Sequence, residues 1–116
     1  MDEQRNDRPK LLFVCSRNRI RSLTAEEVFR EIGGLNVRSA GTQPGARILI
    51  NEKHIRWANT IFVMERSHLA KLQSRFLEAL EGKAVVVLDI PDIYDPMDPE
   101  LVSDLWSKVA DHYPLP

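Results

Sequence analysis

One short segment of the chain combines a nucleophile with an anion-binding pattern. Residues 15–22 read CSRNRIRS, and Cys15 is the only cysteine among the 116 residues. The segment follows a continuous apolar run at 11–14 and precedes a segment with helical periodicity. A loop from the end of a strand into the start of a helix directs several backbone N–H groups at one point. There, the N–H groups and the helix dipole favour a phosphate dianion, and the same field favours a cysteine thiolate. The segment therefore predicts an anion-binding loop that carries a thiolate nucleophile.

Three polar side chains of this loop fit that chemistry. Arg21 has a planar guanidinium that matches two phosphate oxygens and follows them as charge is redistributed during transfer. The Ser22 hydroxyl can donate to the sulfur when a phosphocysteine breaks down, and Asn18 tolerates a left-handed backbone and can bond the loop. We predict Cys15 and Arg21 as catalytic residues. The predicted substrate-binding residues are Ser16, Arg17, Asn18, Arg19, Ile20 and Ser22.

A lone cysteine after an apolar run is most often only a small buried hydrophobic residue. The three arginines at 17, 19 and 21 argue against that interpretation, because they repel one another and have no role in a core. An anion between them would explain their grouping. We expect Arg17 and Arg19 to be solvated charges at the rim, which attract anions without touching the reacting group.

A second stretch that could carry chemistry spans residues 89–98, DIPDIYDPMD. Phosphoryl transfer to a thiolate needs a proton for the leaving oxygen, and a carboxylic acid can supply it and then activate water. Three aspartates of the stretch, at positions 89, 92 and 95, could serve. Asp98 has a structural explanation instead, because Asp98-Pro99-Glu100 is a helix N-cap followed by a first-turn proline and acid.

Predicted strands and helices, which must position these residues, alternate along the chain. Apolar runs predict strands at 11–14, 36–40, 61–64 and 84–88. Helical periodicity predicts a helix from Ser22 to the glycines at 33–34, one from Asn51 to Trp57, one from Ser67 to Gly82, and one after Asp98. This alternation predicts an α/β fold: a three-layer sandwich in which a four-stranded parallel sheet has helices on both faces. A ligand then binds at the carboxyl ends of the strands, where Cys15 and residues 89–92 would meet.

Length and composition limit the remaining possibilities. With 116 residues, 43% of them apolar, we expect one domain at 10–116 after a flexible leader at 1–9. The net charge of −1 gives no global field that would recruit a nucleic acid or a membrane, so we expect neither as a partner. One cysteine excludes an internal disulfide and fits a reducing compartment, and the N-terminus is too polar for a signal peptide. We therefore expect a cytoplasmic protein. His54, His68 and His112 are expected on surface helices and form no metal-binding pattern.

Several motifs recur in the order of a known family. They are Leu12-Phe13-Val14-Cys15 through Arg21-Ser22, Thr24-Ala25-Glu26, Ser39-Ala40-Gly41-Thr42 and Phe62-Val63-Met64-Glu65. Together they cover most of the chain, which resembles the low-molecular-weight protein tyrosine phosphatases. The resemblance implies a cysteine-dependent phosphomonoester phosphatase of phosphotyrosine type, which forms a phosphocysteine and needs no metal or organic cofactor. It implies a phosphorylated protein or small phosphomonoester as substrate, and phosphate, sulfate or vanadate as ligands.

The resemblance also bears on the acid and on the supporting residues. The family has Asp-Pro-Tyr in the late loop; Asp92-Ile93-Tyr94 keeps its first and last residues, whereas Asp95-Pro96 keeps the dipeptide. We favour Asp92 as the acid because its distance to the last helix is closer to that of the family. Tyr94, Asp95 and Ser39 are predicted as supporting residues. Ser39 would reach Asn18 and hold the loop, or would be only a serine at the end of a strand.

One departure from the family pattern and two alternative functions remain to be considered. Residues 42–50 contain no aromatic residue, whereas in the family this region forms aromatic walls around a phenyl ring, so a small phosphometabolite remains a candidate substrate. An arsenate reductase begins with the same loop, but the thioredoxin-coupled type needs further cysteines. A non-catalytic phosphate-binding module would keep the loop and lose the acid, so the reach of Asp92 and Asp95 discriminates it from an enzyme.

Overall fold

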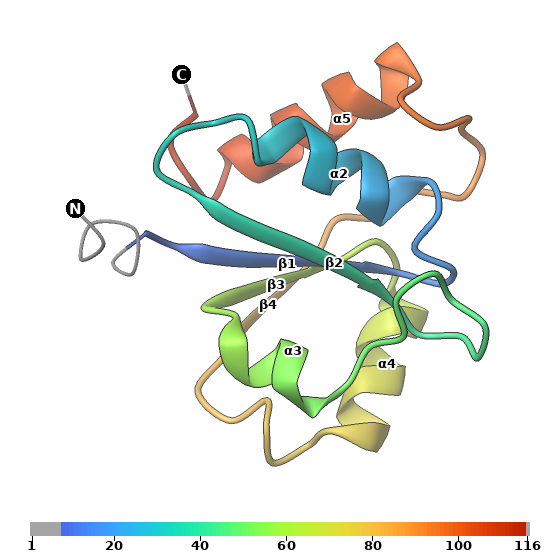
Figure 1. The fold of residues 1–116 in the computed structure, drawn as a ribbon, viewed down its shortest axis with the longest axis vertical. Coiled ribbons are helices and arrows are strands. Elements are labelled where there is room, and N and C mark those ends of the chain that lie inside the picture. Colours follow the sequence, from blue (N-terminus) through green and yellow to red (C-terminus); the bar gives the residue numbers. More distant parts are fainter. Residues whose placement is uncertain (1–7, 116) are drawn as a thin grey trace.

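The computed structural model describes residues 8–115, and within them an α/β sandwich of three layers (Figure 1). The strands are β1 (Lys10–Cys15), β2 (Asn36–Gly41), β3 (Thr60–Val63) and β4 (Ala84–Val87). All three strand pairs are parallel, and the order across the sheet is β2-β1-β3-β4. The helices are α2 (Arg21–Phe29), α3 (Glu52–Trp57), α4 (Arg66–Arg75) and α5 (Pro99–Ala110). The predicted four-stranded parallel sheet with helices on both faces is confirmed. The leader expected at 1–9 lies largely outside the described residues.

The central strand β1 explains the layering. Its residues 11–14 are completely buried, as expected for a parallel strand with both faces covered. Leu11 and Phe13 belong to the core under α2 and α5, whereas Leu12 and Val14 belong to the core over α3 and α4. Alternate side chains of one strand therefore hold two helical layers, which lie above and below the sheet in Figure 1.

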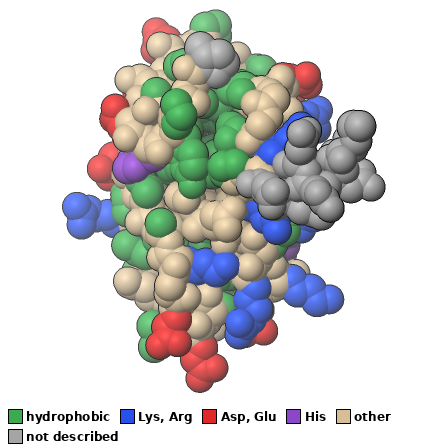
Figure 2. All heavy atoms as spheres, turned by 90° about the vertical axis from the view of Figure 1, so that its left-hand side faces the viewer, with side chains coloured by type: hydrophobic (Ala, Val, Ile, Leu, Met, Phe, Trp, Pro, Cys, Tyr) green, Lys and Arg blue, Asp and Glu red, His purple; other side chains and the backbone are tan. Residues whose placement is uncertain are grey.

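The loops at the carboxyl ends of the strands meet at one edge of this sheet. Cys15 is the last residue of β1, which lies between β2 and β3. The turn after β1, the loop after β2 and the start of α4 converge at this edge, on the right of Figure 1. The amino ends of the strands lie at the opposite edge, on the left of Figure 1. Figure 2 views the molecule from that side, where acidic and basic side chains are interspersed around a hydrophobic area.

The four predicted helices are present, but α2 ends at Phe29, before the glycines at 33–34, and α4 differs from its prediction at both ends. It begins at Arg66 and ends at Arg75, not at Ser67 and Gly82. The N-cap is Glu65, whose backbone N–H donates to His68 Nδ1 at 3.1 Å, a reciprocal cap that needs no serine. At the other end, Phe76 leaves the helical region with φ −134° and ψ 38°. Residues 77–82 continue as turns. No helix among residues 8–115 is both long and apolar enough to cross a bilayer.

Candidate active site

The loop between β1 and α2 turns its carbonyl groups outward and its amides inward. Four successive carbonyl oxygens, of residues 15–18, accept hydrogen bonds from the loop after β2. The donors are the backbone N–H groups of Thr42, Gln43 and Arg47, at 2.9, 2.9 and 3.0 Å, and Arg47 Nε, at 3.1 Å. Asn18 makes the turn with a φ of 57°, in the left-handed region that asparagine tolerates. Peptide groups so oriented have the arrangement that an anion-binding loop requires, with the carbonyl groups bonded on the outer side.

Gly41, at the end of β2, allows this close contact between the two loops. A Cβ atom at position 41 would lie 2.6 Å from the carbonyl oxygen of Ser16 and 2.8 Å from the Cβ of Ala46. No side chain fits there without moving backbone. The lack of space for a side chain therefore explains why the Ser-Ala-Gly-Thr motif has glycine at position 41.

Two donors surround the sulfur of Cys15, a residue that is 3% exposed. Ser22 Oγ lies 2.9 Å from Cys15 Sγ, and the backbone N–H of Asn18 donates to the same sulfur at 3.3 Å. Ser22 Oγ in turn accepts a hydrogen bond from Asn18 Nδ2 at 2.7 Å and lies 3.4 Å from the carbonyl oxygen of Ala40, to which it can donate. Asn18 and Ser22 thus hold the sulfur of Cys15 in a fully hydrogen-bonded position.

Arg21 is held on one side by two acceptors. It is 2% exposed, and its Nη1 donates to Glu65 Oε2 at 2.6 Å and to the carbonyl of Ile90 at 2.9 Å. Since Nη1 is occupied, Nε and Nη2 remain for an anion over the loop. The hydrogen bond from Arg21 also lowers the pKa of Glu65, so the ion pair persists well into the acidic range.

Asp92 reaches the same site from the loop after β4. Its Oδ1 lies 3.7 Å from Arg21 Nε, and its side chain is 62% exposed. A cavity of about 130 Å³ is lined by Cys15, Ser16, Arg17, Arg19, Ile20, Arg21 and Asp92. The structure therefore brings together one nucleophile, one buried cation and one carboxylate. Asn18 and Ser22, which are predicted to bind substrate, both contact the sulfur of Cys15.

The other two predicted residues of the late loop lie elsewhere. Asp95 is exposed, does not line the described cavity, and uses its carbonyl to accept the N–H of Asp98 at 3.2 Å. Tyr94 packs against the core formed with α2 and α5. The Asp98 side chain caps α5 by accepting the N–H of Glu100 at 2.9 Å, as predicted.

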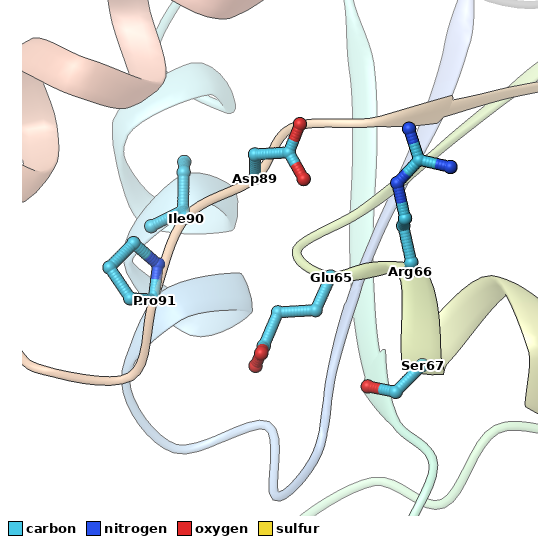
Figure 3. Close-up of a pocket in the computed structure, with 6 residues that line it drawn as sticks. All are labelled: Glu65, Arg66, Ser67, Asp89, Ile90 and Pro91. Carbon is cyan, nitrogen blue, oxygen red and sulfur yellow. The ribbon is translucent and has the colours of Figure 1, made fainter.

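A larger hollow of about 370 Å³ adjoins this cavity and contains no nucleophile. Its lining is Glu65, Arg66, Ser67, Asp89, Ile90 and Pro91, between the start of α4 and the loop after β4 (Figure 3). Figure 3 shows the Glu65 side chain pointing away from Arg66, and the Asp89 carboxylate on the Arg66 side. Glu65 lines this hollow, and its carboxylate is bound by Arg21, which lines the smaller cavity.

Ser39 does not reach the loop. Its Oγ donates to Glu26 Oε1 at 2.6 Å, so it ties β2 to α2. The Asn18 side chain is bonded to Ser22 instead. The expectation that Ser39 holds Asn18 is therefore not met, because the nearest acceptor to the serine is a carboxylate on the neighbouring helix.

His68 contacts the site, although the sequence placed it on a surface helix. It is 1% exposed, and its Nε2 lies 2.9 Å from Ser16 Oγ. Burial and the nearby Arg21 lower the pKa of His68 to about 4, so the ring is neutral near pH 7. Because Nδ1 accepts from Glu65, Nε2 carries the proton and donates to Ser16. The sequence signal that could have indicated this role is the spacing of Glu65 and His68, which lie three residues apart directly after the third strand.

Comparisons with known proteins agree with this geometry. A sequence profile described as low molecular weight phosphotyrosine protein phosphatase matches residues 10–71, whereas no curated protein sequence matches the chain. The fold is similar to that of the YwlE arginine phosphatase from Geobacillus stearothermophilus: 22% identity, TM-score 0.66, with 89% of this chain and 91% of that chain covered. The fold is also similar to that of the tyrosine phosphatase Wzb from Escherichia coli K30, with 20% identity and a TM-score of 0.72. That match covers 88% of this chain and 94% of that chain.

A thioredoxin-dependent arsenate reductase from Corynebacterium glutamicum has the same fold, with 18% identity and a TM-score of 0.63; the match covers 90% of this chain and 59% of that one. Identities this low establish the shared fold only. The profile match spans more than half of the chain and contains the loop, Arg21 and the start of α4. The chain therefore belongs to the low molecular weight phosphotyrosine protein phosphatase family, a family of cysteine-based hydrolases.

Proposed function

We propose that this protein hydrolyses phosphomonoesters of phosphotyrosine type through a phosphocysteine on Cys15, with Asp92 as the general acid. One observation carries the proposal: Cys15, Arg21 and Asp92 line a single small cavity over a loop whose amides point inward. The substrate is a phosphorylated protein or a small phosphomonoester. Phosphate, sulfate or vanadate would bind in the same place.

In the first step, the thiolate of Cys15 attacks phosphorus in line with the ester oxygen. The S–P bond forms as the P–O bond breaks, and protonated Asp92 gives its proton to the leaving oxygen. The loop amides and the free Nε and Nη2 of Arg21 bind the equatorial oxygens, where charge accumulates in a loose transition state. Most of the catalytic stabilisation comes from these donors.

In the second step, a water molecule attacks the phosphocysteine. Asp92, now ionised, accepts a proton from the water as the O–P bond forms and the S–P bond breaks. The sulfur leaves as a thiolate, which Ser22 Oγ and the N–H of Asn18 stabilise. The products are inorganic phosphate and the regenerated enzyme, with no change in oxidation state. A free thiol essential for turnover supports a reducing, cytoplasmic location.

The test is hydrolysis of p-nitrophenyl phosphate, with reductant and without added metal. Cys15→Ser should abolish turnover, and Asp92→Asn should lower it by about 10²–10⁴-fold, the usual contribution of a general acid. Asp95→Asn is the matched control, because Asp95 lies three residues away and outside the cavity. An equal loss in both aspartate variants would contradict the role of Asp92, and full activity in Cys15→Ser would contradict the mechanism.

A phosphate-binding module without catalysis was the main alternative. It required that neither Asp92 nor Asp95 reach the pocket, whereas Asp92 lines it. Arsenate reduction would need an external thiol, because the chain has no second cysteine to resolve an intermediate.

A further inference from the structure

Two exposed arginines, Arg17 and Arg19, line the nucleophile cavity, and their side chains form its rim. Both belong to the loop after β1, whose residues 15–20 contain no aspartate or glutamate. Asp92, from the loop after β4, is the one carboxylate in the cavity lining.

Several other arginines of the described chain have acidic partners. Arg21, Arg30 and Arg56 each have a carboxylate partner within 4.0 Å. Between residues 8 and 115, Arg17 and Arg19 form no ion pair and no side-chain hydrogen bond. Elsewhere, as on the face in Figure 2, charges of both signs are interspersed. The rim thus carries two positive charges that have no partner among residues 8–115, while the one carboxylate of the cavity lining, Asp92, lies 3.7 Å from Arg21. The two unpaired guanidinium groups repel each other until an anion lies between them.

The cavity itself accommodates little beyond the reacting group. Its volume is about 130 Å³, and none of its lining side chains is aromatic. Two aromatic residues outside the cavity have contacts of their own: Tyr94 packs on the core, and Trp57 is covered by the guanidinium of Arg38 at 4.4 Å. The parts of a substrate that flank the phosphate must therefore lie across the rim, where charge and not stacking provides recognition.

We propose that the Arg17–Arg19 rim selects phosphoproteins in which acidic residues flank the phosphorylated residue. Successive residues of an extended peptide are about 3.3 Å apart, so a glutamate one or two positions from the phosphoresidue comes within reach of either guanidinium. The arginine fork is suited to carboxylates. The inference rests on the proposed function, because it takes the phosphorylated side chain to enter the cavity over Cys15.

Binding to the Cys15→Ser variant tests this selectivity without turnover. Calorimetry at low salt would compare two phosphotyrosyl peptides, one flanked by two glutamates on each side and one flanked by glutamines. Two exposed ion pairs predict about tenfold tighter binding of the acidic peptide, and this ratio should shrink as salt is added. Adding Arg17→Gln and Arg19→Gln should bring the ratio to about two or less, since the ion pairs are then lost.

Arg56→Gln is the matched control, because it removes an exposed arginine on α3 that does not line the cavity. It should leave the peptide ratio unchanged. A ratio near one in Cys15→Ser, a ratio that survives loss of both rim arginines, or equal binding of an unphosphorylated acidic peptide would each overturn the inference.

Turnover by the wild type keeps the two proposals separate. Hydrolysis of both peptides with equal kcat/KM would overturn the rim's selectivity and leave the phosphatase intact. Selective binding of the acidic peptide with no hydrolysis of any phosphoester would overturn the proposed function and leave the selectivity standing.

Discussion

At the scale of single residues, the first turn of α4 holds the catalytic loop at two points. Glu65 binds the guanidinium of Arg21, and the next inward-facing residue, His68, binds the hydroxyl of Ser16. An arginine that is 2% exposed requires such a partner, because an unpaired buried charge is strongly unfavourable. The orientation of Arg21 is therefore fixed before substrate arrives, which reduces the reorganisation needed in the transition state.

His68 should make the stability of the protein depend on pH. The pKa of His68 falls from 6.5 to about 4 in the folded protein, so the unfolded state binds more protons between these values. Because of this difference, the free energy of unfolding decreases as the pH is lowered through this window, by roughly 1–2 kcal/mol between pH 6.5 and 5. Urea denaturation of His68→Gln, in which glutamine keeps the capping position without titrating, should give a flatter pH profile.

Two other groups must be separated from this effect. The pKa of Glu65 is also lowered, but a carboxylate contributes stability that is lost only below about pH 5, outside the measured window. The pKa of His54 is lowered by its partial burial and by Arg38, so His54→Gln is the control for the same window. A His68→Gln profile as steep as that of the wild type would show that His68 is not buried as a neutral ring.

At the scale of elements, the contact between β2 and the nucleophile loop depends on Gly41. In Gly41→Ala, the new methyl group would meet the Ser16 carbonyl at 2.6 Å, and neither backbone can move without breaking the bonds between the loops. We expect a loss of about 1–3 kcal/mol in the free energy of unfolding, as for other overpacked sites. The kcat on p-nitrophenyl phosphate should fall by more than the fraction of protein that is unfolded at 25 °C can explain, because the displaced loop carries Cys15.

Gly45→Ala provides the comparison within the same loop. No atom lies within 4 Å of a Cβ at that position, but its φ of 85° makes the substitution a source of backbone strain alone. Equal losses of kcat in the two variants would contradict the steric role of Gly41.

The elements that could be predicted from the sequence are those whose signals are local. The apolar run before Cys15, the helix faces around Phe29 and Leu105, and the Asp98 cap all follow from periodicity or from neighbours within a few residues. The start of α4 was mispredicted because the capping rule favours Ser67, whereas Glu65 caps through a histidine three residues later. The Ser39–Glu26 bond joins different elements, and no spacing in the sequence indicates which acceptor is closest.

In the site, too, contacts within one segment could be predicted, whereas contacts between distant segments could not. The nucleophile and Arg21 are fixed by seven consecutive residues, so their geometry was predictable. Asp92 could be preferred over Asp95 only by resemblance, because their order along the chain does not reveal which carboxylate turns toward β1. The contact of His68 with Ser16 spans 52 positions and depends on the order of strands in the sheet, which brings the start of α4 beside the loop.

At the scale of the whole molecule, the anion site joins segments from both halves of the chain. The cavity is built by the loop after β1 and the loop after β4, and Arg21 is bonded to Glu65 and Ile90 from the third and fourth strand ends. Phosphate bound there should raise the free energy of unfolding of the whole domain, since the unfolded chain has no such site. At ten times its dissociation constant, phosphate contributes about 1.4 kcal/mol.

This contribution should raise Tm by roughly 4–8 °C in scanning calorimetry, for a domain of this length. Chloride at matched ionic strength tests for general screening, and it should produce a much smaller rise. Arg21→Met should remove most of the phosphate-dependent increase, whereas Arg56→Gln should retain it, because Arg21 lines the cavity and Arg56 does not. If phosphate raised Tm equally in Arg21→Met and Arg56→Gln, the anion would be stabilising the protein from another place, and the loop would not be its binding site.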